Sequence, residues 1–394
     1  MVFRIRTYNN IAEAGLEAFP RGQYEVGGSI ESPDGILLRS ADLHDMSVGP
    51  ELKGVARAGA GVNNIPVPRL SEAGIPVFNA PGANANAVKE LVIAGLLMGF
   101  RNIGPALRFV EELQGEGAEF EKAVEAGKKR FVGRELPGRC LGVVGLGAIG
   151  GQVANAARAL GMEVIGFDPA LTVEHAWRLA SDVRQARSLD ELLAESDVVS
   201  LHVPLIDKTR DLINARRLAV MPAGAVLLNF ARDGLIDRAA LLESLESGHL
   251  GGYVTDFPHP ELQGREGVSA LPHLGASTGE AEVNSAVLAV RNLREFLENG
   301  NIRHSVNFPD VAMPRTEGAR LGIANANVPN MVGQVGTALA EAGLNIVDLL
   351  NRSRGELAYT LVDVDGELPD DIPARLTAIE GVLRVHVTPP LPAR

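Results

Sequence analysis

The fold of this chain is decided by the stretch Leu141-Gly-Val-Val-Gly-Leu-Gly-Ala-Ile-Gly150 and its continuation, Gly-Gln-Val-Ala-Asn-Ala-Ala-Arg-Ala-Leu160. The apolar run from Leu141 to Val144 predicts a buried strand. Glycines follow in the spacing Gly-x-Gly-x-x-Gly, and apolar residues then recur every three or four positions up to Leu160, which is typical of a helix face. The stretch therefore predicts a strand, a glycine-rich turn and a helix.

Each glycine of this turn has a mechanical role. Gly145 permits a tight turn, Gly147 lets the backbone approach a pyrophosphate, and Gly150 lets the helix pack on the strand, so the phosphates would lie at the helix N-terminus. A second apolar strand ends at Asp168, where a carboxylate accepts hydrogen bonds from the ribose hydroxyls of NAD and repels a 2′-phosphate. Chance alone produces such a spacing in a glycine-rich chain, but the strand, helix and acid in register predict an NAD site.

Composition limits the remaining possibilities. The 394 residues are too many for one core and predict two or three domains. The net charge of -12 argues against a nucleic-acid partner, because phosphate binding needs a basic surface. The longest apolar run, Leu91 to Phe100, is too short for a membrane span, and no signal-peptide core follows Met1. Because Cys140 is the single cysteine, we expect no disulfide and no metal centre. We expect a cytoplasmic protein without a membrane partner.

The chain predicts three domains. Alternating strand and helix patterns over residues 1–100, together with residues 282–308, predict a flavodoxin-like α/β domain that binds substrate; a helix pattern runs from Gly279 to Asn299. Residues 101–281 predict an inserted dinucleotide-binding domain with a doubly wound parallel (Rossmann) sheet. Residues 315–394 show the order βαββαβ, which predicts a small ferredoxin-like domain. The fold class is therefore α/β with a third domain at the C-terminal end.

Three polar residues, Arg232, Glu261 and His273, each follow a predicted strand of the dinucleotide-binding domain. Because carboxyl ends of parallel strands converge on the ligand crevice, we expect them to meet there. Hydride transfer from an alcohol needs a base such as histidine for the hydroxyl proton, and a carboxylate substrate needs a cation such as arginine. A carboxylate behind the histidine would fix its tautomer. Singly, each residue is also explained as an ion pair or a structural histidine; together they predict a catalytic set.

Several stretches resemble the D-isomer-specific 2-hydroxyacid dehydrogenases, and together with the glycine motif they cover most of residues 1–308. They are Asn79-Ala-Pro81, Val88-Lys-Glu-Leu91, His202-Val-Pro204, Asn229-Phe-Ala-Arg-Asp-Gly-Leu-Ile-Asp237 and Pro272-His-Leu-Gly-Ala-Ser-Thr278. The resemblance implies NAD as cofactor and places the family's catalytic arginine, acid and histidine on Arg232, Glu261 and His273.

The resemblance also implies the contacts with the cofactor. The family's aspartate at the nicotinamide amide falls on Asp256. The implied cofactor-binding residues are Gly145, Gly147, Ala148, Ile149, Gly150, Asp168, His202, Val203, Pro204, Phe230, Ala231, Asp256, His273, Gly275 and Ala276.

The chain departs from the family pattern near the acid. Asp233 stands where the family usually has glycine, and Asp256 is followed directly by Phe257 without the usual hydrophobic residue between them. Counting five residues from Asp256 gives Glu261 as the acid. If the alignment follows Phe257 instead, the acid position holds Pro260 and the acid is lost.

The substrate domain resembles the family at Arg39, Ser40, Arg57 and Gly61, positions that the family uses near its substrate. The resemblance therefore implies a site for a substrate phosphate at these four residues. For each arginine, the alternative is a surface charge without a ligand.

Residues 315–394 resemble the ACT regulatory domain, in which matching positions bind serine at an interface between two such domains. The implied effector residues are Asn325, Asn327 and Asn345, with L-serine as a possible effector. The alternative is that Asn325 and Asn327 only cap the following helix and that the domain only dimerises.

The resemblance implies an NAD-dependent oxidation of 3-phospho-D-glycerate to 3-phosphooxypyruvate, the first step of L-serine biosynthesis, in a homodimer or homotetramer. The alternative within the class is a hydroxypyruvate or glyoxylate reductase, whose substrate differs in lacking the phosphate. An NAD-sensing interaction protein is the alternative from another class, since this fold also serves as a corepressor. The presence of both Arg232 and His273 argues against the sensor.

Overall fold

The computed structural model describes residues 2–390 and divides the chain into two compact units. Unit 1 comprises Met1–Asn84 and Gly279–Arg394, and unit 2 comprises Ala85–Thr278. Unit 2 begins earlier than the predicted 101, because Val88 and Val92 of the first helix are buried in its core. The substrate-binding and cofactor-binding roles of the domains stay predictions.

Unit 2 is built on a seven-stranded sheet whose strands are all parallel. The strands are β6 (Cys140–Val144), β7 (Glu163–Phe167), β8 (Arg184–Gln185), β9 (Val198–Leu201), β10 (Ala225–Asn229), β11 (Leu250–Thr255) and β12 (Val268–Ala270). Their order is β12-β11-β10-β9-β6-β7-β8. From β6 the chain adds β7 and β8 on one side of the sheet; it then crosses back and adds β9 to β12 in turn on the other side of β6. This order confirms the predicted doubly wound sheet.

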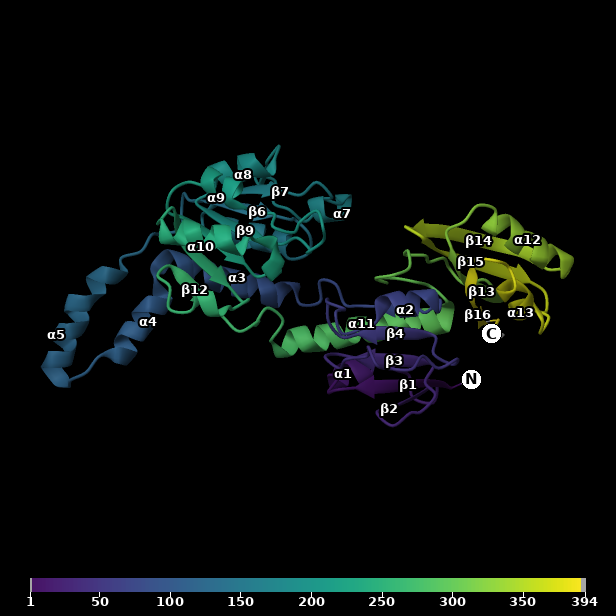
Figure 1. The fold of residues 1–394 in the computed structure, drawn as a ribbon. Coiled ribbons are helices and arrows are strands. Elements are labelled where there is room, and N and C mark those ends of the chain that lie inside the picture. Colours follow the sequence, from purple (N-terminus) through teal and green to yellow (C-terminus); the bar gives the residue numbers. More distant parts are fainter. Residues whose placement is uncertain (1, 391–394) are drawn as a thin grey trace. The chain divides into compact units, whose positions relative to one another are not determined.

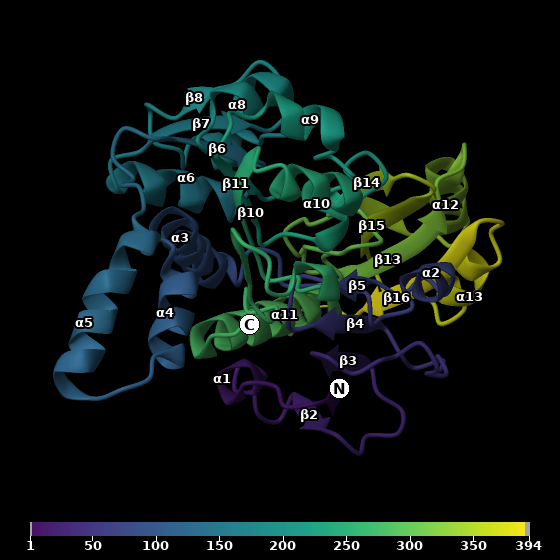
Figure 2. The same ribbon diagram turned by 60° about the vertical axis from the view of Figure 1, so that its left-hand side comes forward.

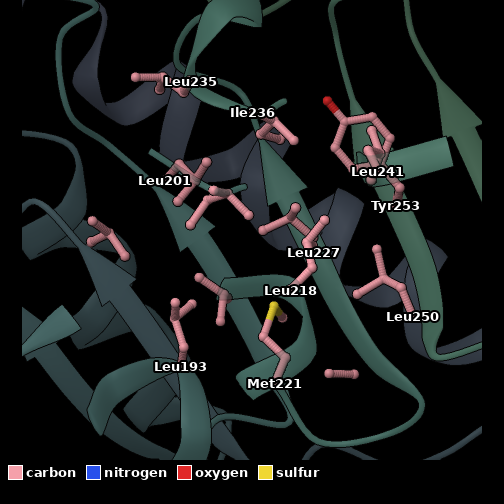
Figure 3. Close-up of a cluster of buried hydrophobic side chains, with 14 of the residues drawn as sticks. Leu193, Leu201, Leu218, Met221, Leu227, Leu235, Ile236, Leu241, Leu250 and Tyr253 are labelled. Carbon is pink, nitrogen blue, oxygen red and sulfur yellow. The ribbon is translucent and has the colours of Figure 1, made fainter. Parts of the chain in front are cut away.

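Helices cover both faces of this sheet. They are α3 (Ala85–Arg101), α6 (Gly150–Ala159), α7 (Val173–Ala176), α8 (Leu189–Glu195), α9 (Ala215–Val220) and α10 (Arg238–Glu246), with short 3-10 turns η2 (Asp233–Leu235) and η3 (Pro260–Leu262). Side chains of α8, α9 and α10 pack on one face, among them Leu193, Leu218 and Leu241 (Figure 3). Residues of α3 and α6 pack on the other face. Both faces are buried, which explains why the central strands are nearly all apolar.

Two further helices of unit 2 extend away from its sheet in both views, α4 (Ile103–Glu112) and α5 (Gly117–Gly127), followed by η1 (Lys128–Phe131) (Figures 1 and 2). No residue of either helix is buried. The sequence did not predict them as separate helices, because neither contributes to the core that fixes the apolar pattern.

Local signals in the sequence explain several element boundaries. The sequence Ser188-Leu-Asp-Glu191 forms a capping box at the start of α8, in which Ser188 Oγ accepts a hydrogen bond from Glu191 N at 3.1 Å. The carboxylate of Glu191 accepts from Arg187 N, one residue before the cap. Asp237 caps α10 in the same way, through Ala240 N.

Unit 1 contains a second parallel sheet, of five strands in the order β2-β1-β3-β4-β5. The strands are β1 (Phe3–Tyr8), β2 (Tyr24–Gly27), β3 (Gly35–Leu38), β4 (Gly54–Arg57) and β5 (Val77–Phe78), and the helices are α1 (Glu13–Leu16), α2 (Val67–Glu72) and α11 (Gly279–Asn299). The buried side of α11, including Leu293 and Phe296, packs on Ile5 and Leu37 of the sheet. The strand β2 was not predicted, because it has only four residues and lies at the edge.

The C-terminal part of unit 1 is an antiparallel sheet with the predicted βαββαβ order. Its elements are β13 (Ala319–Ala326), α12 (Met331–Glu341), β14 (Asn345–Arg354), β15 (Leu357–Asp365), α13 (Ile372–Thr377) and β16 (Val382–Thr388). The strand order β14-β15-β13-β16 confirms the ferredoxin-like arrangement.

Among the described residues, no single helix is both long and apolar enough to cross a membrane, and only α3 and α4 taken together, bent by 69°, have the necessary length and composition.

Candidate functional site

The glycine-rich turn lies where the two halves of the unit 2 sheet meet, between β6 and β9. Gly145 has a φ of 91°, and a Cβ there would lie 2.6 Å from the carbonyl oxygen of His202. A Cβ at Gly150 would overlap the carbonyl oxygen of Gly145. A Cβ at Gly147 would meet no atom within 4 Å, so the backbone there faces open space. The turn therefore fits the pyrophosphate of a dinucleotide at the start of α6.

Asp168 follows β7 and is held against this turn by its carboxylate. Oδ2 accepts a hydrogen bond from Leu146 N at 2.9 Å, and Oδ1 accepts from Ala170 N at 2.9 Å. Each carboxylate oxygen has a second lone pair, so both can still accept from ribose hydroxyls. The position agrees with the predicted role in NAD recognition.

His202 follows β9 and faces the same turn. Its backbone N donates to Val144 O at 2.7 Å, and its Nε2 lies 2.9 Å from Ser200 Oγ. Burial lowers the pKa of His202 to about 4, so the imidazole is neutral at physiological pH. The next residue, Val203, also adjoins Gly145, and the predicted segment His202–Pro204 thus borders the glycine turn.

Asp256 organises the edge of the sheet beyond β11. It is 1% exposed, its Oδ2 accepts from Gly275 N at 3.0 Å, and its backbone O accepts from His273 N at 2.9 Å. Oδ1 is buried and has no hydrogen-bond partner among the described residues. Asp256 therefore fixes the segment with His273 and Gly275, and it offers one buried acceptor that an amide group would satisfy.

His273 and Arg232 lie close to Asp256. Burial raises the pKa of Asp256, and the hydrogen bond from Gly275 N together with electrostatic interactions with His273 and Arg232 opposes that effect. The exposed His273 ring packs edge-on against Phe257, with 4.9 Å between centroids. Asn229 fixes the Arg232 backbone, because its Nδ2 donates to Arg232 O at 2.9 Å. The structure thus brings Arg232, Asp256 and His273 together at the carboxyl edge of one sheet.

Glu261 is not brought to His273. It lies in η3 with an exposed side chain, and its Oε2 is 3.9 Å from Arg238 Nη1. Leu262, which is 3% exposed, anchors this turn in the core and leaves Glu261 facing outward. Within residues 2–390, Glu261 makes no hydrogen bond to His273. The predicted catalytic role of Glu261 therefore has no support in this geometry.

A cluster that sequence reasoning missed lies directly beside Arg232. Asp233 Oδ1 is 2.8 Å from His259 Nε2, and Asp233 Oδ2 is 3.1 Å from Arg238 Nη2. These contacts tie the turn after β10 to the segment after β11. The signal in the sequence was Asp233 itself, at a position where the family usually has glycine.

In unit 1, the predicted substrate residues lie at the carboxyl ends of β3 and β4. Arg57 Nε donates to Arg39 O at 2.9 Å, and Ser40 N donates to Asn9 Oδ1 at 3.1 Å. Arg39 Nη2 donates to Glu282 Oε1 at 2.6 Å. The structure therefore brings Arg39, Ser40 and Arg57 together, with Gly61 in the loop after β4.

The predicted effector residues are divided within one copy of the chain. Asn325, which is 1% exposed, pairs with Ala358 at the start of β15, whereas Asn345 pairs with Asp365 at its end. Asn327 Nδ2 donates to Gly355 O at 3.0 Å, at the same end as Asn325. A single copy therefore brings Asn325 and Asn327 together and leaves Asn345 at the opposite end of the sheet.

The helix-capping alternative for these asparagines is wrong. Asn330 occupies the N-cap position of α12, and no side chain caps that helix. Asn325 Nδ2 donates to Ala326 O instead, and its Oδ1 is buried without a partner in the described chain.

This architecture is shared with known proteins. Residues 94–275 match the family model of the D-isomer specific 2-hydroxyacid dehydrogenase, NAD binding domain. The chain is 34% identical over 354 residues to a D-3-phosphoglycerate dehydrogenase of Haemophilus influenzae, with 87% of this chain and 82% of the relative covered. It is 35% identical over 369 residues to a D-3-phosphoglycerate dehydrogenase of Synechocystis sp., with 91% of this chain and 62% of that longer relative covered.

A solved structure supports the same assignment. The NAD+-bound 3-phosphoglycerate dehydrogenase of Entamoeba histolytica matches with a TM-score of 0.61 and 26% identity, over 78% of this chain and 99% of that one. These matches, with the glycine turn and Asp168 in place, confirm NAD as the cofactor. The chain belongs to the D-isomer-specific 2-hydroxyacid dehydrogenase family and, within it, groups with the D-3-phosphoglycerate dehydrogenases.

Proposed function

We propose that the protein oxidises 3-phospho-D-glycerate to 3-phosphooxypyruvate with NAD, the first step of L-serine biosynthesis. One observation supports the chemistry: His273, whose N donates to Asp256 O, and Arg232 both follow strands at the carboxyl edge of the sheet whose central turn fits the dinucleotide. The names of the relatives support the choice of substrate.

Each residue of the set has one task in this proposal. When bound, NAD supplies the acceptor for the hydride that leaves C2 with its electron pair. His273 accepts the proton of the C2 hydroxyl as general base. Arg232 pairs with the substrate carboxylate through its planar guanidinium. Asp256 orients the segment that carries His273, through the hydrogen bond from His273 N, and offers its free oxygen to the cofactor amide.

The substrate phosphate is the second part of the proposal. Arg39, Ser40 and Arg57 supply two guanidinium groups and a hydroxyl at one edge of the unit 1 sheet. The pairing of Arg39 with Glu282 is partly exposed, so a phosphate dianion can compete for that guanidinium. A phosphate at these residues would distinguish the proposed substrate from glyoxylate and hydroxypyruvate.

We also propose that the protein forms a homodimer or homotetramer. The helix α4 supports this proposal, because Leu107 and Val110 are 59% and 49% exposed and none of its residues is buried. Apolar side chains in such a row favour self-association. A cytoplasmic location stays a prediction.

The test of function is the formation of NADH with a panel of 2-hydroxy acids with and without a 3-phosphate. We expect turnover with 3-phospho-D-glycerate and much weaker turnover with D-glycerate and D-lactate. Faster reduction of glyoxylate or hydroxypyruvate would favour the reductase. Cofactor binding is measured separately by fluorescence of Trp177, which is the single tryptophan and is 85% exposed in the segment after β7. NAD binding without turnover of any substrate would favour the sensor.

A further inference from the structure

A pocket of unit 1 lies on the face of the five-stranded sheet opposite α11. It has a volume of about 190 Å³ and lies between β1, β3 and the loops at 31–33 and 46–52. Side chains alternate along a strand, so Arg6 and Tyr8 point to the face opposite Ile5. Ile5 packs in the core with α11, and Tyr8 packs against the core of the other face. Arg6 and Tyr8 both line the pocket.

The sequence explains why this face is open. In the sheet Arg6 pairs with Gly27 on one side and with Ile36 on the other. Gly27 has no side chain, and a Cβ at this position would meet no atom within 4 Å. Residues 28–34 join β2 to β3 without a helix, so the connection covers little of the sheet. Space therefore remains beside Arg6.

The guanidinium group of Arg6 has no hydrogen-bond acceptor among the described residues. Its Nε is buried without a hydrogen-bond partner, and Arg6 forms no ion pair with any described residue. The Arg6 guanidinium lies over the Tyr8 ring, with 4.9 Å between Arg6 Cζ and the ring centroid. By contrast Arg4, on the same strand, contacts Glu25 and donates to Ser32 O. A partly buried guanidinium without an acceptor is costly, so Arg6 favours an anionic ligand.

The pocket also presents negative charge. Glu31 and Glu51 line it, and in the described chain neither carboxylate lies within ion-pair distance of a cation; Glu51 interacts electrostatically with Arg384. The side chains of Ser32 and Ser47 add hydroxyl groups to the lining. A simple anion would be attracted by Arg6 and repelled by the two carboxylates. A small molecule with both charges satisfies all three groups.

We propose that this pocket binds a small zwitterion, with its carboxylate at Arg6 and its ammonium group at Glu31 and Glu51. Free α-amino acids have this chemistry. The pocket differs from the proposed substrate site in its lining, because none of the residues Arg39, Ser40, Arg57 and Gly61 lines it. The pocket runs along the sheet face from the loop at 31–33, at the amino edge, to Tyr8 at the end of β1, and the substrate residues follow β3 and β4.

The test is calorimetric titration of the full chain with glycine, acetate and inorganic phosphate as probes. We expect glycine to bind, and acetate and phosphate to bind at least tenfold more weakly because they lack an ammonium group. Arg6→Met, which keeps the apolar stem, should abolish glycine binding. The control is Arg21→Gln, which removes an exposed arginine of unit 1 that does not line the pocket and should bind glycine like the wild type.

Two further variants keep the result decisive. Glu51→Gln changes an exposed side chain and should weaken glycine binding while strengthening acetate binding. Asn345→Ala should leave glycine binding unchanged, which separates this pocket from the predicted effector residues of the C-terminal sheet. Equal binding of glycine and acetate would overturn the proposal that the ligand is a zwitterion. Absence of glycine binding, or unchanged binding in Arg6→Met, would overturn the site. Neither result depends on catalytic turnover, so failure here is distinguishable from failure of the proposed oxidation.

Discussion

Arg320 and Asp363 form a two-pronged ion pair in the interior of the C-terminal sheet. Arg320 Nε donates to Asp363 Oδ1 at 2.5 Å and Nη2 donates to Oδ2 at 2.9 Å, and both side chains are 0% exposed. Nη1 also donates to the carbonyl oxygens of Asn299 and Met313, and Nη2 donates to Pro314 O. The pair therefore joins the neighbouring strands β13 and β15 to the end of α11 and to the linker that follows it.

Arg320→Met should destabilise unit 1 by about 3–5 kcal/mol, because it leaves a buried carboxylate without its partner. The measurement is the urea midpoint followed by circular dichroism. The double variant Arg320→Met with Asp363→Leu should recover much of the loss, since it removes the unpaired charge as well. A loss below about 1 kcal/mol in the single variant would show that water or another group replaces the arginine.

Two partly buried histidines, His202 and His386, predict acid sensitivity. Burial lowers the pKa of His202 and of His386 to about 4, from an ordinary value of 6.5. The unfolded chain then binds more protons than the folded one between these values, so stability is fully present above pH 6.5 and is lost as the pH falls toward 4. Urea midpoints at pH 7.5, 5.5 and 4.5 measure the effect. In His386→Gln the urea midpoint should depend less steeply on pH. An unchanged dependence on pH would exclude this histidine as a cause.

Asp168 should make NAD the preferred cofactor over NADP. A 2′-phosphate beside this carboxylate is repelled and removes a hydroxyl that the carboxylate would bind. We expect kcat/KM to be at least tenfold lower with NADP than with NAD. Asp168→Ala should reduce this difference, because it weakens the binding of NAD. Ala170→Gly, in the segment that donates to the same carboxylate, is a control that should keep the preference. Equal efficiency with both cofactors would remove Asp168 from this role.

His273→Ala should lower kcat by roughly 100-fold or more, the usual effect of removing a general base. Arg232→Ala should lower kcat and raise KM together, because the arginine binds substrate and transition state alike. Glu261→Gln should change kcat less than threefold, since its carboxylate faces Arg238. The Trp177 fluorescence titration checks that each variant still binds NAD. Near wild-type turnover in His273→Ala, or a large loss in Glu261→Gln, would reverse these assignments.

The sequence predicted the parts of the molecule in which local pattern and packing agree. The strand, turn and helix around Gly145 were predictable because each glycine meets a steric requirement, and α11 matched its predicted range of 279–299. The sequence did not predict elements that bury few apolar side chains, such as β2 and α5.

The predicted catalytic acid, Glu261, lies at a position that spacing alone could not settle. Spacing from Asp256 placed Glu261 beside His273, but the direction of the side chain depends on Leu262, whose burial turns Glu261 outward. The three effector asparagines show the same limit. They lie close to loops in the sequence, and only the strand register reveals that Asn345 is at the far end of β15.

The last prediction concerns that separation. If L-serine is an effector, its site needs Asn327 from one copy and Asn345 from another, because one copy holds them at opposite ends of its sheet. Serine should then inhibit the wild type, and Asn327→Ala or Asn345→Ala alone should abolish inhibition without loss of catalysis. When the two variants are mixed so that subunits exchange, each mixed pair regains one complete site, so partial inhibition should return. Activity that stays flat up to millimolar serine would leave the C-terminal sheet a role in assembly alone, and inhibition that survives in Asn345→Ala would place the effector elsewhere.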